Sequence, residues 1–250
     1  MKIDAFLTPF FPEKENQFND NIVVMIDVLR ASTTICTALH GKAKEIIPCE
    51  SLEKAVHIYG NLDRNVRFLG GERDCTKPEG FDAGNSPAEY FEDKVSGKTV
   101  IITTTNGTKI FQKAKHAVYR IIGSFVNLDV VKNYIMEIIN HPDLKVNGVI
   151  FLCAGTNGRL SYEDTLCAGA FIKELTKEIK DSELTDTAHV AKSLYNLHSI
   201  EMEDFLKSRE HSQILIDLGF ESDIDLALTR NAYPVVPVIC GNSIKIENRD

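Results

Sequence analysis

Short, continuous apolar segments alternate with helix-like segments along most of this chain. Examples are NIVVMIDVL (21–29), KTVIITT (98–104) and GVIFLC (148–153), each followed by a polar turn and a helical pattern. A strand that is apolar on both faces needs cover on both sides, and helices between parallel strands supply it. The alternation therefore predicts an α/β fold with three layers, α/β/α, in which the middle layer is a mostly parallel or mixed sheet. It also predicts two related βα halves.

The pattern also predicts where the elements lie. Strands are expected at 2–7, 21–29, 43–49, 66–70, 98–104, 117–122, 148–153, 235–240 and 243–247. Helices are expected at 33–40, 51–60, 86–92, 108–115, 127–140, 162–180, 186–198, 200–219 and 224–229. The late helices interrupt the alternation, so we expect them to pack on one side or to form a cap.

No Pro-, Gly- or Ser-rich linker divides the 250 residues, which favours a single α/β domain spanning 1–250. A faint internal similarity relates VVMIDVLRASTTICTAL to VIITTTNGTKIFQKA, at an offset of about 75 residues. This similarity suggests two interwoven repeats, at about 1–95 and 96–250.

Composition and charge exclude several classes of protein. The net charge is −8, and no basic cluster is interleaved with aromatic residues, so we expect no nucleic-acid partner. The apolar runs fall far short of the roughly 20 residues that cross a bilayer, and MKIDAFLTPFF does not resemble a signal peptide. The six cysteines show no CxxC spacing. We therefore expect a cytoplasmic protein with reduced thiols and no membrane partner; a homo-oligomer is left open.

Two strands end in the same polar tripeptide, in IITTTNGT (101–108) and in VIFLCAGTNGRLS (149–161). Ligands of open parallel sheets bind outside the carboxyl ends of strands, where helix N-termini offer unpaired N–H groups to anions. Both loops are therefore candidate anion sites, although both could also be ordinary helix starts. The candidate residues are Thr104, Thr105, Asn106, Gly107, Thr108, Asn157, Gly158 and Arg159.

Carboxylates follow other strand ends. Asp27 closes the apolar run IVVMID, Glu72 follows the strand in FLGGERD, and Glu163 and Asp164 begin the helix after the second TNG loop. Mg²⁺ prefers one or two carboxylates, with water and phosphate oxygens completing six ligands. Asp27, Glu72 and Asp164 are therefore the candidate metal ligands, although Ser161 and Asp164 also fit a capping box.

Four arginines lie in polar turns beside these features and suggest a small polyanionic substrate, because the guanidinium group matches phosphate, carboxylate and sulfonate oxygens. They are Arg30, Arg73, Arg159 and Arg230. Ser32, in the turn DVLRAST, is a further substrate-binding candidate. Asn85 and Ser86, in NSPAEY, read mainly as a helix start but could also face the site.

Five ordered blocks together resemble the 2-phosphosulfolactate phosphatase family, and they span Val23 to Ile239. The blocks are VVMIDVLRASTTICTAL, GGERDCTKPEGFDAGNSPAEY, TTTNGT, CAGTNGRLSYEDTLCAGAFI and LALTRNAYPVVPVI. The resemblance implies an α/β/α fold with repeated halves. It also implies a Mg²⁺-dependent phosphohydrolase that removes phosphate from 2-phospho-3-sulfolactate, on the route to coenzyme M.

On this reading Asp27, Arg30, Glu72 and Asn106 are the expected catalytic residues, with Mg²⁺ polarising phosphorus and activating a water. An aspartyl-phosphate on Asp27 is an alternative, but haloacid-dehalogenase-like phosphatases carry a second Asp where this chain has Leu29. Cys153 lacks the CxxxxxR loop of cysteine phosphatases. A phosphatase of another 2-phospho acid, or a non-catalytic protein that binds anionic metabolites, remains open.

Overall fold

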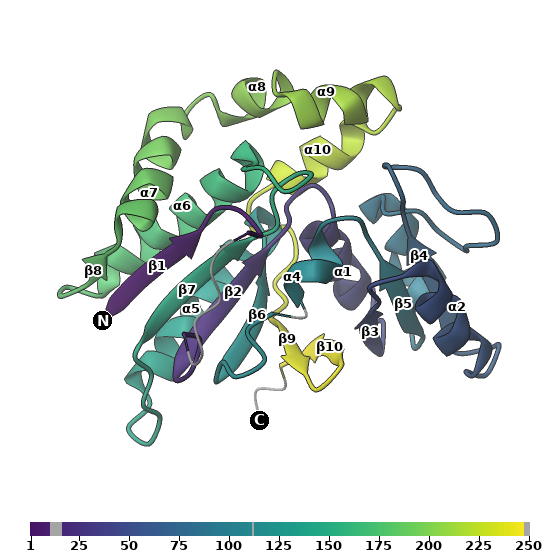
Figure 1. Cartoon of the computed structure of the whole chain (residues 1–250), viewed down its shortest axis with the longest axis horizontal. Helices are drawn as coiled ribbons and strands as arrows, with labels where there is room; N and C mark the ends of the chain where they lie inside the picture. The colour runs from purple at the N-terminus through teal and green to yellow at the C-terminus, as the bar shows by residue number, and fades with distance from the viewer. Residues whose placement is uncertain (11–16, 112, 248–250) are drawn as a thin grey trace.

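A computed structural model describes residues 1–10, 17–111 and 113–247, in which ten strands form one mixed sheet (Figure 1). The strands are β1 (Lys2–Phe6), β2 (Asn21–Ile26), β3 (Glu45–Pro48), β4 (Arg67–Gly71), β5 (Thr99–Thr103), β6 (Tyr119–Gly123), β7 (Gly148–Cys153), β8 (Glu183–Leu184), β9 (Pro237–Cys240) and β10 (Ser243–Ile246). Their order across the sheet is β4-β5-β3-β10-β9-β6-β2-β7-β1-β8.

The described helices lie between these strands along the chain. They are α1 (Ala31–His40), α2 (Leu52–Gly60), α3 (Glu92–Val95), α4 (Gly107–Phe111), α5 (Leu128–Asn140), α6 (Tyr162–Glu178), α7 (Asp186–His198), α8 (Met202–Lys207), α9 (Glu210–Asp217) and α10 (Glu221–Leu228). Two 3₁₀ turns are added at η1 (Pro87–Tyr90) and η2 (Phe125–Asn127).

The sheet consists of two parallel groups that run in opposite directions. β4, β5 and β3 are parallel to one another, and so are β6, β2, β7, β1 and β8. Between the groups, the pairings β3–β10, β10–β9 and β9–β6 are all antiparallel. Because there are three reversals of direction between them, the two groups run antiparallel to each other. In a flat sheet, the carboxyl ends of one group would therefore lie at the edge opposite those of the other group.

Helices cover both faces because the side chains of each strand alternate between faces. Along β2, Ile22 and Val24 face the core beneath α5 and α6, whereas Val23 and Met25 face α1 and α4. α2 covers Leu69 and Ile101 of the smaller group. The predicted α/β fold is confirmed, with helices on both sides of a mixed sheet.

Most predicted elements occur close to the expected ranges, and the differences have local causes. β8 has two residues, too few for a periodic signal. The single helix expected at 200–219 is broken into α8 and α9, because the Ser208 and Arg209 side chains donate to the Phe205 carbonyl where the helix would continue. The segment 86–92 forms the 3₁₀ turn η1 rather than a helix, and α3 follows it.

Each of the two proposed repeats contributes strands to both parallel groups of the sheet. The unit β2-α1-β3 starts in the larger group and ends in the smaller one, and β5-α4-β6 crosses back. Consequently β2 pairs with β6, and β3 pairs with β5. This pairing interleaves residues before and after position 95, while the duplication itself stays a prediction.

The helices after β7 pack on the larger group and extend over its end. α7 packs against α6, and the chain then runs through α8, α9 and α10 as an arch across the top of the view in Figure 1. No helix in the described part of the chain is long and apolar enough to cross a membrane.

Candidate active site

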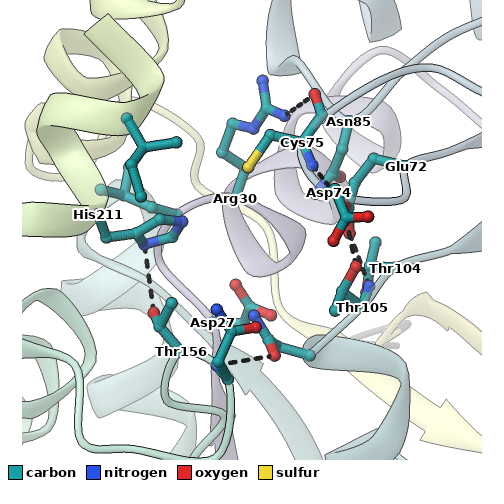
Figure 2. Close-up of a pocket in the computed structure, with 14 residues that line it drawn as sticks. Asp27, Arg30, Glu72, Asp74, Cys75, Asn85, Thr104, Thr105, Thr156 and His211 are labelled. Carbon is teal, nitrogen blue, oxygen red and sulfur yellow. Dashed lines mark hydrogen bonds between the residues drawn. The ribbon is translucent and has the colours of Figure 1, made fainter. Parts of the chain in front are cut away.

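A cavity of about 200 Å³ lies where the carboxyl ends of β2, β4, β5 and β7 meet beneath α9 (Figure 2). It therefore receives side chains from both parallel groups of strands. The predicted site residues that line it are Asp27, Arg30, Glu72, Asn85, Thr104, Thr105, Asn106 and Asn157. The polar residues that follow separate strands in the sequence thus lie together at one cavity in the structure.

Asp27 is a buried carboxylate at the end of β2, only 6% exposed. Its Oδ1 accepts a hydrogen bond from the Ala31 N–H at 3.3 Å. Burial raises the pKa of Asp27 to about 7; Glu72 and Glu163 add to the rise, whereas His211 and the Ala31 N–H oppose it. Ser32 shapes this turn, because its Oγ accepts from the Asp27 N–H at 2.8 Å. Ser32 is not among the residues that line the cavity.

Glu72 ties the loop after β4 to the loop after β5. Its Oε1 accepts from the Thr105 N–H at 2.6 Å, and its Oε2 accepts from the Cys75 N–H at 2.9 Å and the Thr105 hydroxyl at 3.1 Å. The neighbouring Arg73 does not line the cavity: its guanidinium donates to the Glu72 carbonyl and to Thr103 Oγ1. Arg73 therefore supports the loop that presents Glu72.

The two TNG loops contact each other. Asn106 Oδ1 accepts from the Asn157 N–H at 3.4 Å, a long hydrogen bond that joins the loops after β5 and β7. Thr104 and Thr108 form an ordinary helix start, since Thr104 Oγ1 accepts from the Thr108 N–H and the Thr108 hydroxyl donates to the Thr104 carbonyl. The loops are thus both helix starts and walls of the cavity.

Glycine is required in each TNG loop for a different reason. A Cβ on Gly107 would lie 2.6 Å from Asp27 Oδ2 and 2.7 Å from the Ala31 Cβ, so only glycine lets α4 approach Asp27 this closely. In the second loop, Asn157 and Gly158 have φ values of 52° and 79°, and Thr156 and Arg159 exchange backbone hydrogen bonds at 3.0 Å across them. This tight turn directs Asn157 to the cavity and Arg159 away from it.

Arg30 supplies a buried positive charge on the cavity wall. It is 3% exposed, its Nη1 donates to Asp223 Oδ2 at 2.8 Å, and its guanidinium stacks 4.3 Å from the centre of the Phe220 ring. Ser86 donates to the other oxygen of Asp223 at 2.6 Å, so Ser86 lies behind Arg30 rather than on the wall. The Asn85 Oδ1, by contrast, is buried without a hydrogen-bond partner among the described residues.

His211 reaches the cavity from α9, on the side opposite Glu72 in Figure 2. Its Nδ1 lies 2.7 Å from Glu163 Oε1 and 3.3 Å from Thr156 Oγ1. Burial lowers the pKa of His211, but contacts with Cys75 and Glu163 outweigh this effect and raise the pKa to about 10. The imidazole is therefore positively charged at neutral pH.

Comparison with known proteins identifies the family of this chain. The model of a family described as 2-phosphosulpholactate phosphatase matches residues 8–242. The chain belongs to the 2-phosphosulfolactate phosphatase family. The resemblance carried by the five sequence blocks is thereby confirmed, and the match places the chain in a family of phosphoric monoester hydrolases.

Similar curated proteins cover nearly the whole chain. A protein of Caldanaerobacter subterraneus subsp. tengcongensis is 39% identical over 230 residues, which are 90% of this chain and 92% of the relative. A protein of Thermotoga maritima is 39% identical over 216 residues, 86% and 88% of the two chains. A third, from Clostridium beijerinckii, is 35% identical over 95% of this chain and 96% of its own. Each is named a probable 2-phosphosulfolactate phosphatase.

Asp164 and Arg230, which were also predicted for this phosphatase-family site, do not line the cavity either. Both carboxylate oxygens of Asp164 accept hydrogen bonds from the backbone. Oδ1 accepts from the Val28 N–H at 2.8 Å, and Oδ2 accepts from the Gly155 N–H at 2.9 Å. Arg230 pairs with Asp129 at 2.8 Å on the surface and is 40% exposed. Asp164 therefore joins the ends of β2 and β7, and Arg230 joins α5 to the segment after α10.

The geometry bears differently on the two alternative nucleophiles, Asp27 and Cys153, because Asp27 lines the cavity and Cys153 does not. The apolar side chain of Leu29 lines the cavity at the position where the aspartyl-phosphate route needs a second Asp. Cys153 is fully buried and does not line the cavity, and burial holds its pKa well above the ordinary value of a thiol. A buried thiol of this kind is chemically inert.

The cavity also contains residues that the sequence analysis missed. They are Leu29, Asp74, Cys75, Thr156, His211 and Ile214. Cys75 and Asp74 have positive φ values of 62° and 51°, so the turn after Glu72 folds its side chains into the site. His211 stands 48 residues from Glu163 along the chain and has no metal-pair or triad spacing, so no local signal identifies it.

Proposed function

We propose that this family member is a Mg²⁺-dependent phosphatase of a small phosphomonoester with further acid groups, and that its substrate is 2-phospho-3-sulfolactate. The products are 3-sulfolactate and inorganic phosphate. The observation that carries the proposal is the meeting of Asp27 and Glu72, from strands of opposite direction, at one cavity of about 200 Å³. The relatives' names support the choice of substrate.

Asp27 and Glu72 suit Mg²⁺, whereas the third predicted ligand does not. Glu72 Oε1 accepts one hydrogen bond and so keeps a lone pair, and a cation would relieve the burial that raises the pKa of Asp27. In the described residues no three His, Cys, Asp or Glu side chains are placed to hold a metal together. One or two carboxylates, with water and phosphate oxygens, are the usual protein ligands of Mg²⁺.

Bound Mg²⁺ would neutralise charge on the phosphoryl group and lower the pKa of an attacking water. The protein side chains then orient the ester. Asn106 uses its Oδ1 toward Asn157, which leaves its Nδ2 to donate to a phosphoryl oxygen. Arg30 adds positive charge from the cavity wall, although Asp223 shares that charge. Such oriented donors act on charge that develops as the phosphoryl group transfers.

The substrate's second acid group has room in a neighbouring hollow of about 630 Å³. This hollow shares Thr156, Asn157, His211 and Ile214 with the cavity, and it contains Arg159. A guanidinium there suits a sulfonate or a carboxylate. Arg159 is thus a candidate for recognising the acid group farther from phosphorus. Arg230 lines neither the cavity nor the hollow.

Steady-state phosphate release tests the proposal on 2-phospho-3-sulfolactate, on a 2-phospho acid without sulfonate, and on p-nitrophenyl phosphate. We expect turnover with Mg²⁺ and its loss in EDTA. Arg159→Ala should lower kcat/KM at least tenfold on the sulfonated ester and little on p-nitrophenyl phosphate, and Arg230→Ala serves as the matched control. Release of no phosphate from any ester, with any divalent ion, would leave the non-catalytic anion-binding alternative.

A further inference from the structure

Glu163 and His211 form a carboxylate–histidine pair of the kind that orients a catalytic imidazole. Glu163 begins α6, His211 lies on α9, and both are largely enclosed, with side-chain exposures of 4% and 14%. Glu163 Oε1 and Thr156 Oγ1 both contact the same ring atom, Nδ1. A carboxylate that binds one ring nitrogen sets the tautomer and aims the other nitrogen.

The other ring nitrogen, Nε2, is turned to the cavity. His211 lines the cavity on one side and Glu72 on the other, with Asp27 between them at the end of β2 (Figure 2). An ester whose phosphoryl group sits at Asp27 and Glu72 therefore extends its alcohol portion toward α9. The neighbouring hollow, which holds Arg159, opens on this same side and also contacts His211.

The charge state of His211 suits a proton donor. Its contacts with Cys75 and Glu163 outweigh the effect of burial and raise its pKa to about 10, so it holds two ring protons at neutral pH. Asp27 also interacts with this positive charge, which partly offsets the rise in the pKa of Asp27. A protonated imidazole can give up a proton to an aliphatic alkoxide, which is far more basic than imidazole.

We propose that His211 is the general acid of the reaction, donating the Nε2 proton to the ester oxygen of the leaving alcohol. This inference rests on the proposed phosphatase function. The bond from water oxygen to phosphorus forms, the bond from phosphorus to the ester oxygen breaks, and its electron pair takes the proton from Nε2. The attacking water leaves both its protons on the product, H₂PO₄⁻, which returns one proton to His211 and departs as HPO₄²⁻. Glu163 is a positioning residue, since it acts through His211.

Leaving-group dependence distinguishes a general acid from a residue that only holds α9 in place. The variant is His211→Gln, assayed with Mg²⁺ on an alkyl ester, 2-phospho-3-sulfolactate, and on an aryl ester, p-nitrophenyl phosphate. An alkoxide needs a proton as it leaves, whereas p-nitrophenolate does not. We expect kcat to fall about 10²–10⁴-fold on the alkyl ester and less than about tenfold on the aryl ester.

Equal losses on the two esters would overturn the role of His211 while leaving the phosphatase function intact. Wild-type turnover of the alkyl ester is measured in the same experiment, so a failure of the proposed function shows separately as no turnover at all. The exposed His189 of α7 provides the matched control, and His189→Gln should change neither rate. Thermal melting of each variant reports whether the fold is kept.

A second variant keeps the inference testable if His211→Gln does not fold. Glu163→Gln retains a hydrogen-bond acceptor for Nδ1 but removes the negative charge that, together with the contact with Cys75, raises the pKa of His211. We expect the basic limb of the kcat–pH profile on the alkyl ester to move to lower pH, with no such movement on p-nitrophenyl phosphate. A basic limb that stays in place on the alkyl ester would contradict proton donation by His211.

Discussion

At the scale of single residues, Asp27 combines a cost in stability with a proposed role in binding Mg²⁺. Burial, together with the negative charges of Glu72 and Glu163, raises its pKa from 3.8 to about 7. A raised pKa means that the folded state binds the proton more tightly than the unfolded state does. The protonated Asp27 therefore stabilises the folded state fully below about pH 4, and this contribution is lost as the pH rises through about 7. A divalent cation would offset this loss.

Asp27→Asn should separate these two effects. In metal-free buffer at pH 8 we expect the variant to be as stable as the wild type or more so, by at most about 4 kcal/mol, because no buried charge has to form. At pH 4 the difference should disappear. With Mg²⁺ the variant should lose turnover. Thermal melting with and without Mg²⁺, followed by phosphate-release assays, provides the measurements, and unaltered turnover would remove Asp27 from the mechanism.

At the scale of elements, the site depends on how closely α4 approaches the end of β2. Gly107 makes this approach possible, since any Cβ there would overlap both Asp27 and Ala31. The contact between Asn106 and Asn157 then links the loop before α4 to the loop after β7. Each loop therefore holds the other at the cavity, and a small displacement of α4 moves two walls at once.

Gly107→Ala should displace α4 and weaken the site. Overpacking of this kind costs about 1–3 kcal/mol, and we expect turnover to fall by a larger factor than stability alone explains. Gly60→Ala is the matched control: Gly60 ends α2, and a Cβ there meets nothing within 4 Å. The control should be neutral or up to about 1 kcal/mol more stable. Normal kinetics in Gly107→Ala would show that the close approach of α4 is not needed.

At the scale of the whole molecule, several buried groups shift stability in the same direction with pH. The pKa of Asp27 is raised to about 7 by burial, that of Asp164 is raised by burial and by Asp27, and that of His211 is raised to about 10 by its contacts with Cys75 and Glu163. Each of these groups therefore binds its proton more tightly in the folded state than in the unfolded state. The metal-free protein should therefore lose stability as the pH rises from about 5 to 9.

Chemical denaturation in EDTA at pH 5, 7 and 9 measures this trend. We expect the free energy of unfolding to fall with increasing pH. Glu163→Gln should make the part between pH 7 and 9 less steep, because the pKa of His211 then loses the contribution of Glu163 and keeps only that of Cys75. Surface carboxylates with lowered pKa values, such as Glu45 and Asp129, act in the opposite direction only near and below pH 4. Stability that rises from pH 5 to 9 would contradict this assignment of the buried protons.

The sequence by itself determined the elements and the polar strand ends of this protein. Apolar runs such as the one at 21–29 are local, and a run buried on both faces has few alternatives to a covered strand. Asp27 and Glu72 stood out because a carboxylate at the end of an apolar run has no packing role. The TNG loops stood out because two strands end alike. These signals lie within a few residues of each other, so they can be read from one segment.

Only the tertiary structure decided which of these residues meet. The reversal between the two groups of strands follows from β9 and β10, which are far along the chain from β2 and β5. Arg30 pairs with Asp223 across 193 positions, Val28 donates to Asp164 across 136, and His211 meets Glu163 across 48. Buried charges need partners, but many carboxylates can serve, so the choice depends on how helices pack. Packing therefore removed Asp164 and Arg230 from the cavity and added His211 to it.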